Sequence, residues 1–391
     1  MIQIKPYSEL PDPKLALDIF LYNAAVALPF PGEFVFTDGA FWDGRTGEVN
    51  PDIDEFNKRF NKLYDEKHLE DIRKMIFSYS SKLGSFLYSG KELKRDNLHT
   101  LLTSPMDEFT LQQNGIFEII EEVDKTQPKN SKHLLDTVFR YDSLSSSRRK
   151  GNIYEYIKLL NVEVCPYCNR MFTSTVVKEE QQDKRIRPQL DHYWNKDNYP
   201  FLALSIMNLV PSCGVCNLTK GTDKRPVLYP YKEGLGKAFR FKTEPDAENP
   251  DMSYLTGSNT VFTVALCQAS DEVPKDYAQR VKNSMEVFCL EKLYQHHTRF
   301  LSDLFLQRYI FTEEYCEELA VTFPEMFPSV EDMKGVLYLR SIRQSDWGER
   351  PLSKLVHDID SEIGELQKSV FYKNKPICYA EADKIIPTSK K

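Results

Sequence analysis

The chain has 391 residues, a mass of 45.5 kDa and a formal net charge of −7. Hydrophobic residues make up 41% and charged residues 28%, which excludes a fibrous, collagen-like or wholly disordered protein. No window approaches the 18 consecutive apolar residues of a membrane-spanning helix, and the first five residues lack the basic-then-apolar pattern of a secretion signal. We therefore expect a cytoplasmic protein that has no membrane partner.

The first region, residues 1–147, is predicted to be mainly helical. Apolar residues recur at helical spacing from Asp54 to Leu87 and again from Phe109 to Val123. Pro-rich and polar segments separate these patterns. We assign this region a helical fold and no chemistry.

The middle region, residues 148–230, combines short helices and strands. Between Arg148 and Arg225 there are 13 Lys/Arg and 8 Asp/Glu, so the rest of the acidic chain carries −12. A basic segment of this size is only weak support for a polyanion site. We predict a helix at Ile153–Leu160, a β-hairpin of Met171–Val177 with Arg185–Tyr193, a short strand at Asn208–Pro211, and a helix after Cys213.

The last region, residues 231–391, is again predicted to be helical, after a loop-rich stretch at 243–260. A stripe of apolar residues near its end has the spacing of an amphipathic helix. Such stripes pack into cores, and we assign this one no function. Its members are Leu352, Leu355, Val356, Ile359, Ile363, Leu366 and Val370.

Four of the eight cysteines form two tight pairs, Cys165-Pro-Tyr-Cys168 and Cys213-Gly-Val-Cys216. A C-x-x-C turn brings two thiolates to one side of a loop, and two such turns complete a tetrahedral zinc site with no open position. The alternatives are redox-active or incidental cysteines. Two matched pairs in a protein expected to be cytoplasmic favour a structural zinc ion over disulfides.

Between and after the cysteine pairs, chemically distinctive residues follow in a fixed order: Asp191-His192, then Asn208, then Asn217, then Lys220-Gly221. With the cysteines, this order resembles the HNH or ββα-metal endonucleases, in the branch that a four-cysteine zinc site stabilises. The resemblance covers about 60 residues. It implies an α+β fold in which a small zinc-stapled ββα-metal unit is embedded in a largely α-helical chain.

The resemblance also implies roles for these residues. His192 is the general base, because an imidazole accepts a proton near neutral pH. Asp191 and Asn217 hold a catalytic Mg²⁺ or Mn²⁺ ion, which neutralises charge on the departing oxygen. Asn208 braces the loop and orients the base. The products would carry a 3′-hydroxyl and a 5′-phosphate.

Each role has a simpler alternative. His192 can be a structural histidine, Asp191 a turn cap, Asn208 a brace for its own loop, and Asn217 a helix N-cap. Tyr193, Trp194, Tyr199 and Phe201 stack on bases in one interpretation and form a small core in the other. The basic residues that we select as phosphate contacts are Lys220, Arg170, Lys196 and Lys224, with Lys220 foremost because it shares a helix with Asn217.

Several short phrases also resemble an HNH group of bacterial anti-phage systems, the Septu type, in which an HNH subunit works beside an ATPase. Among them are Asp191-His-Tyr-Trp-Asn-Lys and Arg350-Pro-Leu-Ser-Lys-Leu355. The chain has no Walker-type phosphate loop, so ATP dependence would come from a partner. The leading hypothesis is a metal-dependent endonuclease that cuts DNA and is restrained by an ATPase or sensor partner. The alternative is a zinc-stabilised nucleic-acid-binding or assembly subunit without cleavage of its own.

Overall fold

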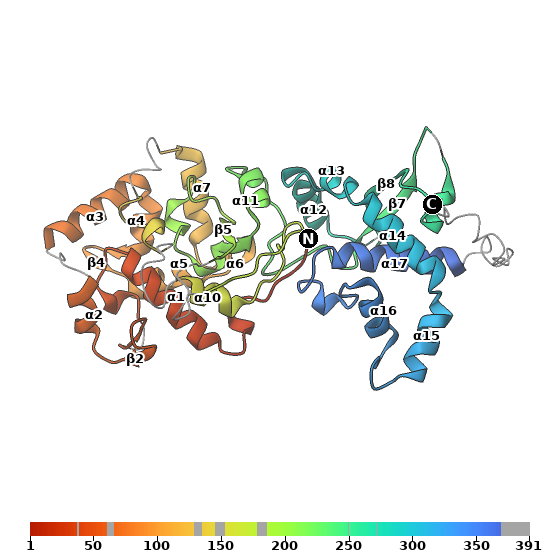
Figure 1. Ribbon diagram of the computed structural model, residues 1–391. Helices are drawn as coiled ribbons and strands as arrows, with labels where there is room; N and C mark the ends of the chain where they lie inside the picture. Colours follow the sequence, from red (N-terminus) through yellow and green to blue (C-terminus); the bar gives the residue numbers. More distant parts are fainter. Residues whose placement is uncertain are drawn as a thin grey trace, which may run out of the picture. The chain divides into compact units, whose positions relative to one another are not determined.

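The computed structural model describes residues 1–36, 39–60, 66–128, 135–144, 153–177, 186–248, 250–270 and 272–368. Within them, helices and small antiparallel sheets alternate in a mixed α and β chain (Figure 1). None of the described helices is long and apolar enough to cross a membrane.

The chain forms two compact units. The N-terminal unit comprises Gln3–Tyr167 and Phe172–Gly234, and the C-terminal unit comprises Met1–Ile2, Cys168–Met171 and Leu235–Lys391. Most of the predicted regions 1–147 and 148–230 therefore belong to one unit. The predicted boundary between those two regions, at residues 147 and 148, lies outside the described residues.

The N-terminal unit is built around α1 (Pro13–Ala27), which is buried along most of its length and packs against α9 and α10. Asp12 caps α1 by accepting a hydrogen bond from the amide of Leu15 at 2.9 Å. The other described helices of this unit are α2 (Ile53–Phe60), α3 (Glu66–Tyr79), α4 (Ser81–Leu87), α5 (Arg95–Thr103), α6 (Glu108–Gln113), α7 (Ile116–Thr126), α9 (Tyr141–Leu144), α10 (Ile153–Leu160) and α11 (Gly214–Lys220).

Three two-stranded antiparallel sheets complete the N-terminal unit. Two of them are short hairpins, and the third joins strands that are distant in sequence. The pairs are β1 (Phe41–Asp43) with β2 (Glu48–Asn50), β3 (Tyr88–Ser89) with β4 (Glu92–Leu93), and β5 (Gln189–His192) with β6 (Leu209–Ser212).

The partner of β5 differs from the prediction. We expected Arg185–Tyr193 to pair with Met171–Val177, but β5 pairs with β6, in a register that sets Asp191 opposite Val210. Between the two segments expected to pair, only the isolated bridge of Val176 with Ile186 is found among the described residues. The physical reason is burial: β6 is buried at all four positions, whereas Val176 and Ile186 are exposed, so pairing with β6 removes more apolar surface from water.

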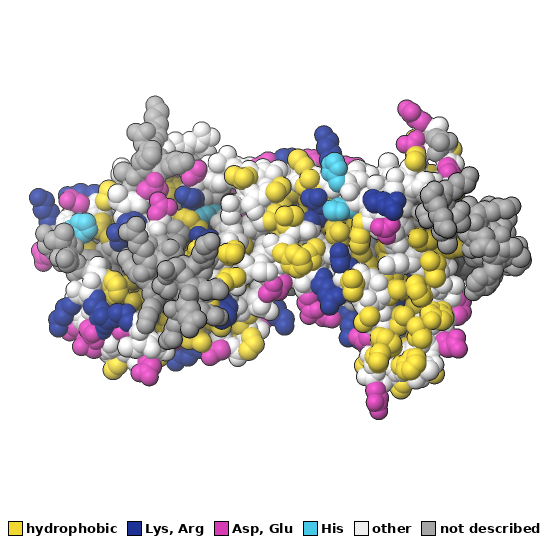
Figure 2. All heavy atoms as spheres, viewed as in Figure 1, with side chains coloured by type: hydrophobic (Ala, Val, Ile, Leu, Met, Phe, Trp, Pro, Cys, Tyr) yellow, Lys and Arg dark blue, Asp and Glu magenta, His cyan; other side chains and the backbone are white. Residues whose placement is uncertain are grey.

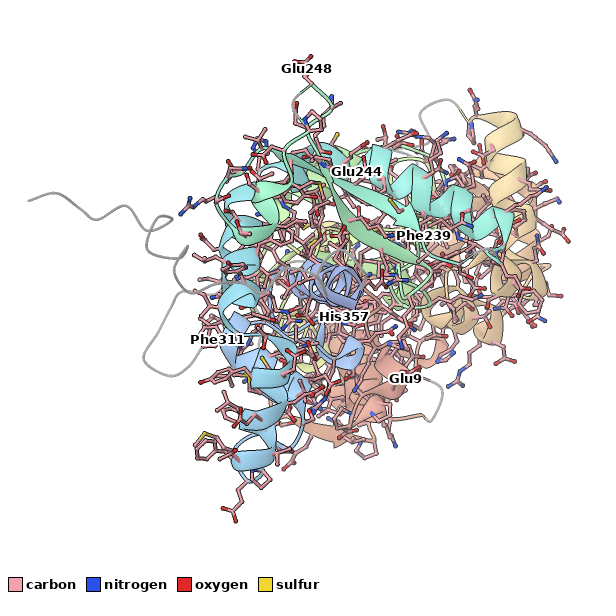
Figure 3. All side chains as sticks on the ribbon, turned by 90° about the vertical axis from the view of Figure 1, so that its right-hand side faces the viewer. Glu9, Phe239, Glu244, Glu248, Phe311 and His357 are labelled. Carbon is pink, nitrogen blue, oxygen red and sulfur yellow. The ribbon has the colours of Figure 1, made fainter. Side chains whose placement is uncertain are left out.

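The C-terminal unit contains a longer hairpin that we did not predict. Strands β7 (Phe239–Pro245) and β8 (Phe262–Gln268) pair over seven residues in part of the chain assigned to loop and helix (Figure 3 labels Phe239 and Glu244 on β7). Buried and partly exposed residues alternate along most of β7, as expected for a strand with one face in the core. The described helices of this unit are α12 (Lys275–Val287), α13 (Leu290–Gln295), α14 (Thr298–Ile310), α15 (Glu313–Thr322), α16 (Val330–Tyr338) and α17 (Ser353–Lys368).

Helix α17 confirms the predicted amphipathic stripe within the described residues. Leu355, Val356 and Ile359 are fully buried, and α17 packs on β7 and α14. Lys354 is buried beside them, where its ammonium binds Asp358 at 2.6 Å and the carbonyl of Phe239 at 3.0 Å. Such a pair is tolerated in a core because each charge has a partner. Val370, the last residue of the stripe, lies outside the described residues.

The start of α17 also anchors the segment Cys168–Met171 of the same unit. Asn169 accepts the amide of Lys354 at 3.1 Å through its side chain and the amide of Leu352 at 2.6 Å through its carbonyl. Its side-chain amide donates to the carbonyl of Trp347 at 2.8 Å. The phrase Arg350-Pro-Leu-Ser-Lys-Leu355 therefore has a packing role, because it binds the backbone that follows Cys168.

A large apolar surface is exposed on the C-terminal unit, over α15, α16 and the turns beside them (Figure 2). Isolated apolar residues on a surface are common, whereas a contiguous group of this kind is typical of a contact surface. Its most exposed members are Val321, Met326, Val336 and Leu339, at 61–80% exposure.

Candidate metal centre and catalytic pocket

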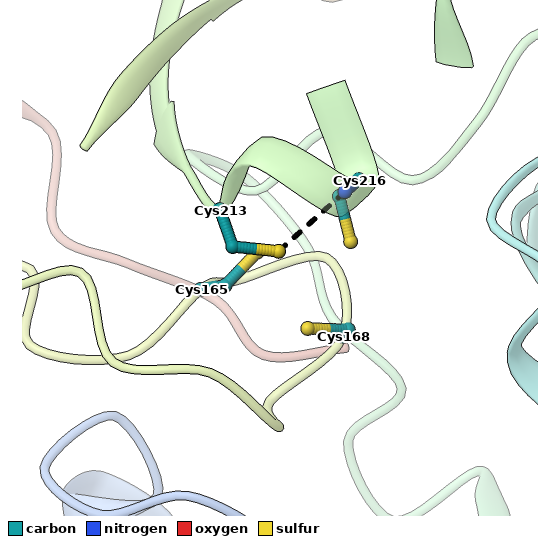
Figure 4. A group of neighbouring side chains, drawn as sticks. All are labelled: Cys165, Cys168, Cys213 and Cys216. Atoms are coloured by element: carbon teal, nitrogen blue, oxygen red, sulfur yellow. Dashed lines mark hydrogen bonds between the residues drawn. The ribbon is translucent and has the colours of Figure 1, made fainter. Parts of the chain in front are cut away.

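The sulfur atoms of Cys165, Cys168, Cys213 and Cys216 lie within 4.8 Å of one another (Figure 4). All four residues are buried, and no disulfide joins them. A tetrahedral zinc ion with Zn–S bonds of about 2.3 Å holds its sulfurs roughly 4 Å apart, so small movements suffice to close the cluster on an ion.

Backbone amides also point at the sulfurs. The amide of Cys216 donates to Sγ of Cys213 at 3.5 Å, drawn as the dashed line in Figure 4, and the amide of Arg170 donates to Sγ of Cys168 at 3.4 Å. Such hydrogen bonds stabilise the negative charge of a thiolate, and the thiolate is the form of cysteine that binds metal. Four thiolates and no oxygen ligand suit zinc, so the cluster can hold a zinc ion in a closed site.

The second centre is built on β5, β6 and α11. Strand β5 ends at Asp191 and His192, β6 returns beside it, and α11 begins one residue after Cys213. Helix α11 packs against β5. This strand–strand–helix arrangement brings together residues that are 26 positions apart in sequence, Asp191 and Asn217.

Asp191, His192 and Asn217 line one open pocket of about 350 Å³. Lys196 is also part of its wall. The structure therefore gathers three residues expected to catalyse or bind the ion, and one expected to bind phosphate. The remaining lining residues are Tyr141, Arg187, Gln189, Leu190, Asn195, Asp197, Gly221 and Thr222.

His192 is 7% exposed, and its Nε2 lies 3.1 Å from the carbonyl oxygen of Ala203. A carbonyl only accepts, so Nε2 carries the proton and Nδ1 holds the lone pair. Burial lowers the pKa of His192 to about 3, partly offset by the bond to Ala203. The imidazole is therefore neutral near pH 7 and has one nitrogen able to accept a proton.

Asp191 is 3% exposed, and both of its carboxylate oxygens have protein partners. The hydroxyl of Tyr167 donates to Oδ2 at 2.6 Å, and the ammonium of Lys220 lies 3.0 Å from Oδ1 and 2.9 Å from Oδ2. Lys220 also donates to the carbonyl oxygen of His192 at 2.6 Å. A cation that bound Asp191 would share this carboxylate with an ammonium, and like charges repel.

Asn217 is half-buried on α11, and its side-chain NH₂ donates to Oε1 of Gln189 at 2.7 Å. This bond uses only the nitrogen of the amide. The amide oxygen, the atom that a hard cation prefers, keeps its lone pairs. Asn217 is therefore held in place by a bond compatible with metal binding.

Asn208 is fully buried and bonds across the loop that follows His192. Its Oδ1 accepts the amide of Trp194 at 2.7 Å, and its Nδ2 donates to the carbonyls of Trp194 at 3.0 Å and Leu202 at 2.9 Å. The next residue along the chain from Leu202 is Ala203, whose carbonyl binds His192. The geometry is that of a brace for the loop that orients the imidazole.

The four selected basic residues have different environments. Lys196 lines the pocket, whereas Lys220, which we placed first as a phosphate contact, is 4% exposed and bound to Asp191. Lys224 pairs with Asp124 at 2.7 Å. Arg170 belongs to the C-terminal unit, where its Nε donates to His297 at 2.8 Å.

Among the aromatic residues after His192, Tyr199 and Phe201 are buried, whereas Tyr193 and Trp194 are half-buried. Phe201 is fully buried, and the polar tips of Tyr193, Trp194 and Tyr199 bond to Val227, Met106 and Asp124. For Tyr199 and Phe201 this burial follows the second of our two interpretations, in which the aromatic residues form a small core.

Among the residues of the site that the sequence did not indicate, three make direct contacts with its predicted members. Gln189 lies two residues before Asp191, on the same side of β5, so the strand period was a usable signal. Tyr167 lies inside the first cysteine pair, and Tyr141 lies about 50 residues before His192. Nothing in the sequence pattern connects either tyrosine to the pocket.

Comparison with known proteins gives one distant relationship. Over 82 residues the chain is 34% identical to the Septu protein PtuB of Bacillus thuringiensis. The match spans 19% of this chain and 28% of that protein. No protein-family model and no solved structure matches the chain. The similarity therefore covers a limited part of both proteins.

Proposed function

We propose that this protein is a metal-dependent HNH endonuclease that hydrolyses phosphodiester bonds of DNA in anti-phage defence. One observation carries the proposal: a neutral imidazole, a carboxylate and a carboxamide from β5 and α11 line one open pocket. The four-cysteine cluster supports it, as the structural zinc site of the same family. The similarity to the Septu protein PtuB supports the defence role.

In the proposed mechanism His192 accepts a proton from water through Nδ1. The carbonyl of Ala203 holds the imidazole through Nε2, and Asn208 braces the loop that carries this carbonyl. An anionic phosphate that enters the pocket raises the pKa of His192 and strengthens it as a base.

Asp191 and Asn217 are the residues that would hold a Mg²⁺ or Mn²⁺ ion, because both line the same pocket and carry the oxygen atoms that such an ion prefers. When bound, such an ion supplies positive charge for the departing oxygen. The ammonium of Lys220 holds the Asp191 carboxylate in place and compensates part of the negative charge of that carboxylate. We therefore expect modest ion affinity, in the millimolar rather than the micromolar range.

The decisive experiment incubates the full-length protein with plasmid DNA and Mg²⁺ or Mn²⁺, beside His192→Ala and the exposed control His68→Ala. We expect His192→Ala to lose at least 100-fold in cleavage rate, as for removal of a general base, while His68→Ala keeps the wild-type rate. Equal cutting by wild type and His192→Ala would show that His192 is not the base. An RNA substrate in parallel determines the nucleic acid.

A role in assembly is favoured by the apolar surface on α15 and α16. The same two helices carry exposed acidic residues, so the surface suits a protein partner with basic side chains beside an apolar centre. They are Glu314, Glu317, Glu318 and Glu331. Co-expression with the product of the neighbouring gene, followed by size-exclusion chromatography, tests this role. Val336→Glu should abolish a complex and leave cleavage by the isolated chain unchanged; a complex that survives contradicts docking on this surface.

A further inference from the structure

Tyr141 belongs to the wall of the catalytic pocket, although it precedes the region that resembles HNH nucleases. It is the first residue of α9, and α9 packs on the central helix α1. Its ring meets the imidazole of His192 edge to face, with centroids 4.5 Å apart and planes at 72°. The ammonium of Lys196 lies 5.6 Å from the centre of the same ring.

The edge-to-face contact with Tyr141 restricts rotation of the imidazole ring, which the hydrogen bond at Nε2 does not prevent. Ala203 holds Nε2 of His192, but a single hydrogen bond leaves the ring free to rotate about that bond. An aromatic pair with this geometry adds about 0.5–1.5 kcal/mol beyond burial. The ring of Tyr141 therefore fixes the plane of the imidazole.

The hydroxyl of Tyr141 has a different role. No described side chain or backbone group forms a hydrogen bond with it, whereas Tyr167, Tyr193 and Tyr199 all donate to protein acceptors. Burial raises the pKa of Tyr141, so the hydroxyl keeps its proton as a donor. The charges that act on this hydroxyl are those of Arg187, Asp142 and Asp191, and Arg187 and Asp191 line the same pocket.

Arg187 adds positive charge beside this hydroxyl. Its Nη1 donates to the carbonyl of Pro188 at 2.9 Å, and its guanidinium lies over the ring of Tyr154. Its Nε is buried and has no hydrogen-bond partner among the residues that the structure describes. Buried donors that lack an acceptor are uncommon, and they indicate a place where an acceptor is missing.

We propose that Tyr141 is a further residue of this active site: its ring positions His192, and its hydroxyl donates a hydrogen bond to the phosphate of a bound nucleic acid. This inference rests on the proposed nuclease function. It assigns part of the site to the helical region outside the nuclease motif, so removal of that region would remove a substrate contact.

Two substitutions separate the roles of the ring and the hydroxyl. Tyr141→Phe removes only the donor, and we expect KM for a duplex oligonucleotide to rise roughly tenfold while kcat changes less than twofold. Tyr141→Leu also removes the ring, and we expect kcat to fall at least tenfold further because the imidazole is no longer fixed. Tyr315→Phe and Tyr315→Leu, on exposed α15, are the matched controls.

Binding provides a readout independent of cleavage. Fluorescence anisotropy of a labelled duplex oligonucleotide in Ca²⁺ should show a roughly tenfold weaker Kd for Tyr141→Phe than for wild type. Circular dichroism and zinc content should match wild type in both variants.

The outcomes distinguish this inference from the proposed function. If wild type cleaves and Tyr141→Phe equals it in KM and Kd, the role of the hydroxyl is wrong. If Phe and Leu variants share one kcat, the positioning role of the ring is wrong. If wild type binds but does not cleave, the nuclease proposal fails, and the anisotropy of Tyr141→Phe still decides the phosphate contact. A wild type that neither binds nor cleaves overturns both.

Discussion

The cysteine cluster and the pocket lined by Asp191 and His192 hold their polar groups in opposite ways. The cluster gathers four identical, buried soft ligands, and nothing in it is open to solvent or substrate. The pocket gathers an imidazole, a carboxylate and a carboxamide around an open space, and each has a different protein partner. The difference shows that backbone amides of its own two turns support the closed site, whereas the open site depends on side chains and carbonyls from other segments.

Removal of one cluster ligand should have the largest effect on this comparison. Cys213→Ser replaces a thiolate with a hydroxyl, which can still accept from the Cys216 amide but is a poor zinc ligand. Structural zinc contributes on the order of 10 kcal/mol to folding, so we expect loss of zinc and unfolding of the surrounding segment. Metal analysis and thermal unfolding measure both effects.

Cys289→Ser is the control for that experiment, because Cys289 is exposed and outside the cluster. It should keep full zinc content. If the wild-type protein contains no zinc, or if Cys213→Ser retains it, the four-sulfur site is wrong.

An intermediate loss of stability is expected when the ion pair of Lys220 with Asp191 is broken. Lys220→Met leaves the buried carboxylate of Asp191 without its cation, which should cost about 3–5 kcal/mol of unfolding free energy. Because a divalent ion can replace the lost charge, Mn²⁺ should raise the Tm of this variant more than that of wild type. Differential scanning fluorimetry with and without Mn²⁺ measures the change.

The comparison variant is Lys224→Met, which breaks the exposed pair with Asp124. It should cost less than about 1 kcal/mol and show no special response to Mn²⁺. A Lys220→Met variant as stable as wild type would contradict the buried ion pair, and one whose Tm does not respond to Mn²⁺ would contradict the role of Asp191 as an ion ligand.

The smallest expected effect is the pH dependence of stability that His192 causes. The pKa of His192 is lowered to about 3 in the folded protein and is about 6.5 when unfolded, so the unfolded state binds more protons between these values. The stability from neutral His192 is complete above pH 6.5 and is lost as the pH falls toward 3. Wild type should therefore lose about 1 kcal/mol more than His192→Asn between pH 7.0 and 5.5.

Urea unfolding of both proteins at the two pH values measures this difference. His297 and His357 also have lowered pKa values, but they are present in both proteins and cancel. Equal losses in wild type and variant would show that His192 is not buried as described.

Local sequence patterns predict an element correctly where residues close in sequence determine its structure. The helix Ile153–Leu160 and the buried face of α17 were predicted from periodicity, because an amphipathic face depends on spacing within one element. The pair β7–β8 was missed, although Phe239, Phe241 and Thr243 alternate inward. Turn-forming and polar residues around these strands indicated a loop, and the hairpin also depends on the packing of β7 against α17.

The sequence by itself determined the cysteine ligands and the order Asp191-His192, Asn208, Asn217, because turn geometry and ligand chemistry depend on residue type and short spacing. Only the tertiary structure decided that β5 pairs with β6, that Lys220 lies beneath Asp191 rather than on the surface, and that Tyr141 reaches His192. The physical reason is that these contacts join residues separated by 17 to 51 positions in the chain, and burial selects them among many alternatives that no local pattern distinguishes.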